Sequence, residues 1–208
     1  MPQQTWIDAF VCIGLGYLIG SVPFGVLAAR MGGLGDIRKI GSGNIGATNV
    51  LRSGRKDLAL ITLIGDAGKG ALAVLMAWAL TKDTPNLALM QALAGGAAFV
   101  GHCFSIWLRF KGGKGVATFF GVVFAVAWPV GLICGAIWLA MAALFRMSSL
   151  AALTAAALAP LFMFLTDRPY PFLWLALFLA VLIFIRHREN IRRLLRGEEP
   201  RIGAKKPS

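Results

Sequence analysis

Long apolar segments separated by short polar ones make up most of this 208-residue chain. A helix that spans a bilayer needs about 20 predominantly apolar residues, and most of these segments approach that length. The alternation of apolar and polar residues typical of a transmembrane β-strand is missing. The pattern predicts an all-α integral membrane protein, with residues 1–208 forming one polytopic domain of about seven transmembrane helices. The predicted segments are Trp6–Ala29, Leu58–Leu80, Leu87–Leu108, Val116–Ala127, Val130–Phe145, Leu150–Leu165 and Pro171–Ile185.

The shortest predicted span is Val116–Ala127. As a helix, this segment would extend only about 18 Å, which is less than a bilayer requires. Either the helix continues into the preceding glycine-rich loop, or the turn at Trp128 and Pro129 lies within the bilayer. A topology of five spans with a re-entrant hairpin is a further alternative, and it leaves the glycine-rich loops on the same side.

The composition agrees with a membrane protein. Hydrophobic residues make up 58% of the chain and charged residues 14%, whereas soluble domains have about 25% charged residues. No basic segment precedes the first apolar run, so we expect no cleaved signal peptide. Cys12, Cys103 and Cys134 stand alone in apolar surroundings, which favours small buried side chains over a disulfide or a metal site.

The net charge of +12 is distributed unevenly. If all seven segments span, every Lys and Arg except Lys69, Lys82 and Arg168 falls on one side. Cytoplasmic loops of membrane proteins carry an excess of Lys and Arg. We therefore expect the N-terminus outside, and the glycine-rich loops and the basic tail of about residues 186–208 in the cytoplasm.

Two glycine-rich loops combine small residues with groups that bind anions. In the first, Gly41–Arg52, an arginine can hold a phosphate with two parallel hydrogen bonds, although a plain flexible loop has a similar composition. The second, Lys111–Thr118, lacks the spacing of a Walker A loop. It lies at the start of a predicted helix, where free N–H groups favour anions, and glycines allow such groups to converge. Positive-inside anchoring is the alternative for its cations.

Two further polar sets lie near the apolar segments. Asp66 and Lys69 are three residues apart, so they share a helix face. They either lock helices together as a neutral pair or extend a cationic pocket inward. His102 and His187 both lie at the predicted cytoplasmic boundary, where a histidine can move protons near neutral pH. The basic helix that contains His187 is also typical of a segment that binds anionic lipid.

Several classes of protein are disfavoured. Only Asp66 among nine carboxylates lies deep in an apolar segment, which argues against a carboxylate-bound metal or a glycosidase pair. The H-x4-D acyltransferase box and the GxSxG motif are missing. A transporter of phosphorylated metabolites would place charge near the bilayer midplane and often shows an internal repeat. A scaffold that binds anionic lipid would explain the tail but not the loops.

The two loops and the tail together resemble the bacterial inner-membrane glycerol-3-phosphate acyltransferases that use acyl phosphate. The three motifs of that family match Gly41–Arg52, Gly101–Thr118, and His187 with Asn190 followed by Glu199. The resemblance implies acyl transfer to the sn-1 hydroxyl of glycerol-3-phosphate, giving lysophosphatidic acid and phosphate. It implies a multi-pass enzyme whose active site faces the cytoplasm. Acyl phosphate is already activated, so we expect no metal or other cofactor.

We expect membrane lipid as a further partner, no nucleic acid, and a monomer. Matching positions in the family's motifs imply roles for several residues, and the loop chemistry suggests the others. Whether His187 or the substrate phosphate accepts the hydroxyl proton stays open. The predicted catalytic residues are Ser42, Arg52, His187 and Asn190. The predicted substrate-binding residues are Asn44, Thr48, Asn49, Lys69, His102, Lys111, Gly112, Gly113, Lys114 and Gly115, and the predicted structural residues are Asp66 and Glu199.

Overall fold

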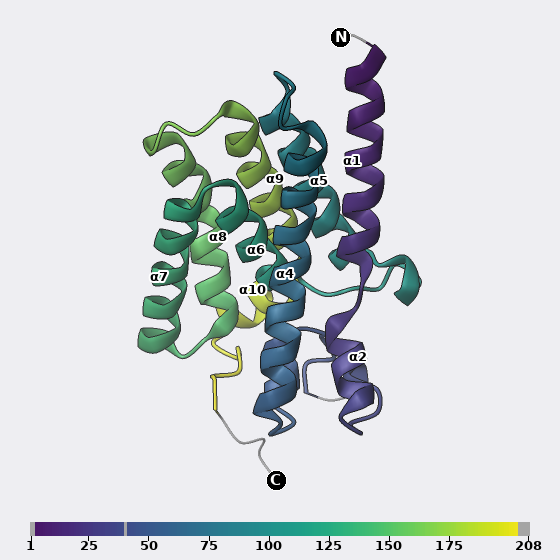
Figure 1. Ribbon diagram of the computed structural model, residues 1–208. Helices are drawn as coiled ribbons and strands as arrows, with labels where there is room; N and C mark the ends of the chain where they lie inside the picture. The colour runs from purple at the N-terminus through teal and green to yellow at the C-terminus, as the bar shows by residue number, and fades with distance from the viewer. Residues whose placement is uncertain (1–2, 40, 204–208) are drawn as a thin grey trace.

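The computed structural model describes residues 3–39 and 41–203, and all regular elements within these ranges are helices (Figure 1). The prediction of an all-α protein is therefore confirmed. Lys205 and Lys206 of the predicted basic tail lie outside the described residues. The α-helices are α1 Gln3–Ser21, α2 Phe24–Met31, α3 Ala47–Leu51, α4 Lys56–Thr81, α5 Leu87–Cys103, α6 Val116–Val126, α7 Trp128–Phe145, α8 Ser148–Leu165, α9 Tyr170–Arg186 and α10 Arg188–Leu195. Two 3-10 helices, η1 Ile37–Lys39 and η2 Ile106–Leu108, lie in the loops.

Five segments of the described chain are long and apolar enough to cross a membrane. They are Gln3–Met31, Lys56–Thr81, Leu87–Leu108, Trp128–Phe145 and Ser148–Leu165. Helix α9 reaches this length only together with α10, which bends away from it by 64°, so we take this sixth span to end with α9. Helix α6 has 11 residues and rises about 16 Å, roughly half of a hydrocarbon core. The count of seven spans therefore stays a prediction.

The first predicted span is interrupted. We expected Trp6–Ala29 to form one helix, but α1 ends at Ser21 and α2 begins at Phe24. Pro23 causes the break, because proline has no N–H to donate and disfavours helical backbone in the residue before it, here Val22. The ammonium of Lys69 on α4 donates a hydrogen bond to the carbonyl of Val22 at 2.8 Å. The Val22 carbonyl, which the break removes from the helical hydrogen-bond pattern, thus has a side-chain partner.

Small residues let the helices approach closely. A Cβ on Gly20 of α1 would lie 2.0 Å from the carbonyl oxygen of Ala98 on α5. A Cβ on Gly121 of α6 would lie 1.9 Å from the carbonyl oxygen of Ala67 on α4. Such contacts are typical of membrane helices, which gain stability from van der Waals packing rather than from excluding water. They bring α1 against α5 and α6 against α4.

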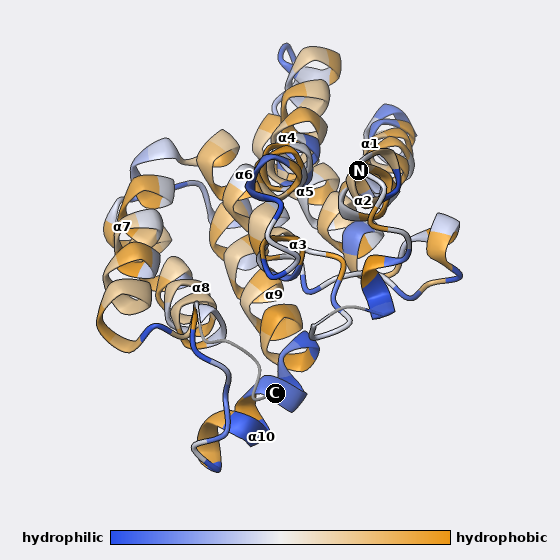
Figure 2. Cartoon of the chain, turned by 90° about the horizontal axis from the view of Figure 1, so that it is seen from below, coloured by the Kyte–Doolittle hydropathy of each residue, from blue (hydrophilic) through white to orange (hydrophobic). Residues whose placement is uncertain are grey.

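The two termini of the described chain lie at opposite ends of the bundle, with the N-terminus at the top of Figure 1 and the C-terminus at the bottom. Seen from below, hydrophilic segments gather at α10, at the η2 loop and along the loops around α3, whereas α7, α8 and α9 are largely hydrophobic (Figure 2). These hydrophilic segments include parts of all three predicted motifs: the loops around α3 belong to the first, the η2 loop to the second and α10 to the third.

Candidate functional site

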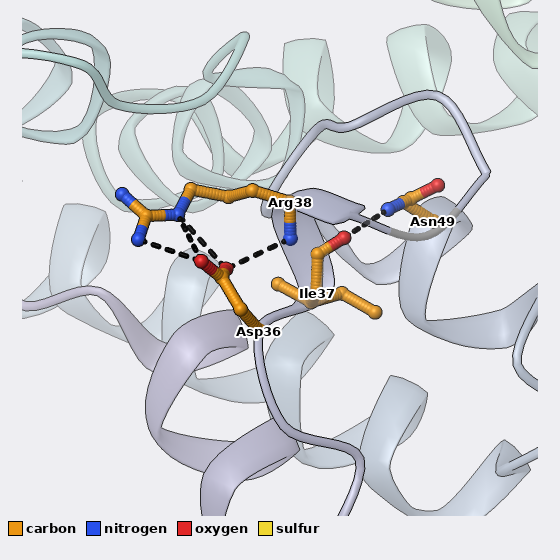
Figure 3. A network of polar contacts seen from close by, with 4 residues as sticks. All are labelled: Asp36, Ile37, Arg38 and Asn49. Carbon is orange, nitrogen blue, oxygen red and sulfur yellow. Dashed lines mark hydrogen bonds and ion pairs between the residues drawn. The ribbon is translucent and has the colours of Figure 1, made fainter.

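The first loop is ordered by a buried asparagine. Oδ1 of Asn49 accepts hydrogen bonds from the backbone N–H of Ser42 at 2.8 Å and from its hydroxyl at 3.1 Å. Nδ2 of Asn49 donates to the carbonyl of Ile37 at 3.1 Å (Figure 3). The Asn49 side chain is 1% exposed, so these contacts hold the loop in shape. Direct contact of Asn49 with a substrate stays a prediction.

The segment before this loop carries its own ion pair. Asp36 accepts hydrogen bonds from the guanidinium of Arg38, with Nη2 and Oδ2 2.8 Å apart (Figure 3). These bonds hold the pKa of Asp36 at about 2, below its usual value. The pair is exposed, so its contribution to stability is small. Asp36 is thus paired with Arg38 and not with a cation at the far end of the loop.

Two side chains of the first motif lie on the surface of the loop, where a ligand can reach them. Ser42 and Arg52 are exposed. Thr48 is exposed as well, and its hydroxyl oxygen lies 3.3 Å from that of Ser148 at the start of α8. Asn44 is half-buried. Four of the five predicted polar residues of this motif are therefore accessible. The fifth, Asn49, is buried and holds the loop in shape through its hydrogen bonds.

The second motif is held from both edges. The N–H groups of Gly112 and Gly113 donate to the carbonyls of Cys103 and His102, each at 3.1 Å. Their own carbonyls accept hydrogen bonds from Arg186, at 3.0 Å for Gly112 and 3.1 Å for Gly113. The expectation that the N–H groups of these two glycines point at an anion is therefore wrong. Any contact of Gly112 or Gly113 with substrate stays a prediction.

Amides suited to an anion remain at the start of α6. The first N–H groups of an α-helix have no partner within the helix, and they carry a partial positive charge. Gly115, which precedes Val116, has φ of +83°, and a Cβ there would lie 2.2 Å from the ring of Phe99. Only glycine fits this position without strain. Lys111 is exposed beside this segment.

The third motif centres on a buried carboxylate. Oε1 of Glu199 accepts hydrogen bonds from Ser149 and from Nδ2 of Asn190, both at 2.6 Å, and Oε2 accepts one from Arg193 at 2.8 Å. Burial by itself would raise the pKa of Glu199, but these hydrogen bonds outweigh burial and lower the pKa. Oδ1 of Asn190 in turn accepts a hydrogen bond from the ammonium of Lys114. Glu199 thus positions Lys114 through Asn190.

Lys114 is the point at which the three motifs meet. Its pKa is lowered to about 8: burial is the largest cause, the positive charges of Arg193, Arg52 and Arg186 also lower the pKa, and the charge of Glu199 opposes them. Arg52 belongs to the first motif, and Arg193 and Glu199 belong to the third. Near neutral pH the ammonium is charged, and it stands among other cations in a partly desolvated position. Such a site attracts a multiply charged anion.

His187 lies at the bend between α9 and α10 and is 3% exposed. Its Nδ1 is 2.8 Å from the carbonyl oxygen of Ile183. Because a carbonyl only accepts hydrogen bonds, Nδ1 carries the hydrogen, and the neutral ring presents Nε2 as an acceptor. Burial, aided by the charge of Lys114, lowers the pKa of His187 to about 4. The imidazole is therefore neutral and weakly basic at physiological pH.

Asp66, Lys69 and His102 form a buried cluster behind the second motif. The ammonium of Lys69 is 2.7 Å from Oδ1 of Asp66, and Nδ1 of His102 is 3.5 Å from the same oxygen. Lys69 is 3% exposed and also bonds the carbonyl of Val22. These contacts favour the helix-locking alternative for Asp66 and Lys69. Substrate binding by Lys69 and His102 stays a prediction.

Four residues of the site were missed by sequence reasoning: Ser148, Ser149, Arg186 and Arg193. The two arginines looked like ordinary members of a basic tail, and nothing in the local sequence distinguishes the two serines. Only the fold shows that Ser149 and Arg193 meet at Glu199. In the described part of the chain, three or more His, Cys, Asp or Glu residues nowhere come together in a way that could hold a metal ion.

The fold and the site define a class: a polytopic helical membrane protein with a cationic site, formed by three separate motifs at one end of the bundle. A family model described as glycerol-3-phosphate acyltransferase matches residues 10–197. The glycerol-3-phosphate acyltransferase of Caulobacter vibrioides is 67% identical over 210 residues, which cover 99% of this chain and 95% of the relative. That of Rhodospirillum rubrum is 61% identical and covers 94% of this chain and 92% of the relative. This chain belongs to the glycerol-3-phosphate acyltransferase family.

Solved structures show the same likeness. The crystal structure of PlsY (YgiH), an integral membrane glycerol 3-phosphate acyltransferase, in its glycerol 3-phosphate form, matches with a TM-score of 0.87 and 40% identity. The match covers 94% of this chain and 96% of that one. The lysophosphatidic acid form of PlsY matches with a TM-score of 0.86, also at 40% identity. These matches confirm both the resemblance and the membrane fold.

The contacts of Glu199 predict a loss of stability when its charge is removed. A glutamine at position 199 would present an N–H₂ group to donors that now bond a carboxylate, so we expect Glu199→Gln to lower the free energy of unfolding by about 1–3 kcal/mol. Glu198→Gln is the matched control, because the Glu198 side chain is exposed. Thermal unfolding of the detergent-solubilised variants measures both. Equal melting temperatures for the two variants would contradict the role given to Glu199.

Proposed function

We propose that this chain transfers a fatty acyl group from acyl phosphate to the sn-1 hydroxyl of glycerol-3-phosphate, giving lysophosphatidic acid and inorganic phosphate. Family membership supports the acceptor and the product, since PlsY is described in forms with glycerol 3-phosphate and lysophosphatidic acid. The observation that carries the proposal is the position of Lys114, where charged groups of all three motifs act on one ammonium. Because one chain supplies all three, the proposal needs only a monomer.

The cations are suited to two phosphorylated substrates. Lys114 and the first N–H groups of α6 offer one phosphate site at the end of a helix. Arg52 is exposed and close enough to Lys114 to affect its pKa, so its guanidinium can hold a second phosphate or share the first. Ser42, on the same loop, has its hydroxyl at the surface. The site therefore positions charged substrates and offsets their mutual repulsion.

The reaction exchanges one carbon–oxygen bond for another. The sn-1 hydroxyl oxygen of glycerol-3-phosphate attacks the acyl carbonyl carbon, and the bond from that carbon to the phosphate oxygen breaks. Inorganic phosphate leaves with the electron pair, and the hydroxyl proton passes to an acceptor. His187, with a pKa of about 4, is a weak base. The phosphate of glycerol-3-phosphate has a second pKa of about 6, so we assign proton uptake to the substrate and orientation to Nε2 of His187.

The site faces the cytoplasm of a bacterial inner membrane in this proposal. The unequal distribution of Lys and Arg supports this orientation, as does the gathering of hydrophilic segments at one end of the bundle (Figure 2). Acyl phosphate is a mixed anhydride, so the transfer needs no coenzyme A and no metal to activate the carbonyl. We propose membrane lipid as the only other partner, because the tail is basic and the bundle is apolar.

A reconstituted assay tests the reaction. Purified protein in detergent, with hexadecanoyl phosphate and labelled glycerol-3-phosphate, should form lysophosphatidic acid without coenzyme A. Activity should persist in EDTA. Failure with acyl phosphate and turnover with acyl coenzyme A would contradict the donor assignment. Loss of turnover in EDTA that magnesium restores would contradict the metal-free mechanism.

The orientation is testable at the two ends of α4. In a variant whose buried Cys12, Cys103 and Cys134 are replaced by alanine, Lys56→Cys should be protected from an impermeant maleimide in intact cells. Asp83→Cys should be labelled, because it lies at the opposite end of the helix. Both native side chains are exposed, so accessibility reports sidedness. Labelling of Lys56→Cys alone would invert the topology.

The pKa of Lys114 predicts a limb in the pH profile. Below about pH 8 the ammonium is charged and can bind phosphate, and above that pH it loses its charge. We therefore expect kcat/KM for glycerol-3-phosphate to fall as the pH rises through about 8. Arginine stays charged throughout this range, so Lys114→Arg should lack the limb even where its activity is lower. A limb that persists in Lys114→Arg would assign the titration to another group.

An apolar groove offers a place for the acyl chain. It lies between α4 and the break in the first span and has a volume of about 290 Å³. Its lining residues are Ile19, Val22, Phe24, Gly65, Gly68, Lys69 and Leu72. Lys69 reaches Asp66 and, through it, His102, whose carbonyl bonds Gly113. The groove is thus connected to the second motif by direct contacts.

Filling the groove should discriminate against long acyl chains. Gly68 lines the groove, and a Cβ there would meet no atom within 4 Å, so Gly68→Leu adds a side chain to the groove from a position with room for its first carbon. We expect it to raise KM for hexadecanoyl phosphate more than KM for octanoyl phosphate. Gly14→Leu is the matched control, because its added Cβ also meets open space and Gly14 does not line the groove. Equal effects on the two donors would place the acyl chain elsewhere.

A further inference from the structure

Arg186, the last residue of α9, binds the backbone of the second motif. Its Nη2 donates to the carbonyl oxygen of Gly112 at 3.0 Å, and its Nε donates to that of Gly113 at 3.1 Å. The guanidinium carbon also lies 5.3 Å from the centre of the Phe104 ring. Two consecutive carbonyls are therefore bound by one planar group, which a flanking aromatic ring helps to orient.

The opposite edge of the same segment is bonded to α5 and the residues that follow it. The N–H groups of Gly112 and Gly113 donate to Cys103 and His102. A Cβ on Gly113 would lie 2.3 Å from Nε2 of His102, and a Cβ on Gly112 would lie 2.0 Å from the His102 carbonyl oxygen. The segment thus lies directly on α5, with Arg186 binding its outer edge. Without Arg186 the segment would be held by the two N–H bonds alone, so these bonds would open more often.

Arg186 also stands between the second and third motifs. Lys114 follows Gly113 in the chain and donates to Asn190 of the third motif. His187 follows Arg186, so the carbonyls that Arg186 binds and the imidazole that comes next are fixed relative to each other. A shift of Gly112 and Gly113 would move Lys114 with respect to both Asn190 and His187.

We infer that Arg186 is a positioning residue, which attaches the Gly112–Gly113 segment to the end of α9 and so sets the place of Lys114 for glycerol-3-phosphate. The inference rests on the proposed function. Two features of arginine are needed. Its planar fork reaches two adjacent acceptors at once, whereas a lysine ammonium acts as a compact point charge. Its charge also makes each hydrogen bond to a carbonyl stronger than a neutral one.

Three variants test the inference. Arg186→Gln removes the charge and the fork, and Arg186→Lys keeps the charge but loses the fork. Arg188→Gln is the matched control. It also removes one positive charge, two residues further along the chain, and the Arg188 side chain is 76% exposed. Hydrogen exchange of the Gly112 and Gly113 amides, followed by mass spectrometry, reports the order of the segment. Steady-state kinetics report KM for glycerol-3-phosphate and kcat separately.

We expect faster exchange at Gly112 and Gly113 in Arg186→Gln, together with a rise in KM for glycerol-3-phosphate of about tenfold. Arg186→Lys should fall between this variant and wild type in both measurements. Arg188→Gln should match wild type. If Arg186→Gln does not fold, the same comparison between Arg186→Lys and Arg188→Gln decides.

Three outcomes would overturn the inference. Exchange and KM in the Arg186 variants could equal those of Arg188→Gln. KM could rise while exchange stays unchanged, which would mean that Arg186 acts on the substrate directly. Exchange could rise while KM stays unchanged, which would mean that the segment does not position Lys114. If wild type itself lacks activity with acyl phosphate, the proposed function fails, and unchanged exchange in the Arg186 variants would separately refute the contact.

Discussion

The rest of the site depends on one constraint, the gathering of positive charge at the edge of an apolar bundle. Lys114 is partly desolvated and lies within the field of Arg52, Arg186 and Arg193. Cations near a low-dielectric interior repel one another more strongly than they do in water. Burial first, and then this repulsion, lower the pKa of Lys114. A phosphorylated ligand would offset the repulsion, so in the proposed function the affinity for the substrate follows from these same charges.

The negative charge of Glu199 offsets part of this repulsion. Glu199 is the carboxylate that acts on Lys114, and from the chain beyond α10 it binds three donors at once, one on α8 and two on α10. Among the described residues, its hydrogen-bonded path to Lys114 runs through Asn190, so the ammonium is not held in a direct ion pair with the carboxylate. A direct ion pair would neutralise Lys114 and compete with phosphate. The Asn190 amide between them holds Lys114 in place without neutralising its charge.

The sequence predicted the helices and the meeting of the motifs better than it predicted the contacts within them. Long apolar segments identify membrane helices because their length is set by the bilayer, and α4, α7 and α8 follow the predictions closely. The break at Val22 was missed although Pro23 is visible, because the surrounding run is uniformly apolar. The partner of that break, Lys69, is 47 residues away.

The second motif shows why the remaining contacts could not be predicted from the sequence. Glycines at Gly112 and Gly113 suggested free amides, yet the structure uses them so that the segment can lie on the His102 carbonyl. Close approach of two backbone segments and binding of an anion both require glycine. Only the neighbouring backbone in the folded protein shows which of the two roles a glycine has. Arg186, 73 residues from Gly113, leaves no local signal beside the other arginines of the tail. Roles that depend on such distant partners need the fold.

The state of His187 bears on how charge changes during the proposed reaction. A neutral imidazole that donates from Nδ1 offers Nε2 as an acceptor, but its pKa of about 4 makes a lasting imidazolium costly beside Lys114. A phosphate with a second pKa of about 6 takes the proton more readily. Protonation lowers the negative charge of that phosphate, so the surrounding cations bind it less strongly than before. Proton uptake by the substrate would then complete acyl transfer and loosen the product in one step, without any group of the protein changing its charge.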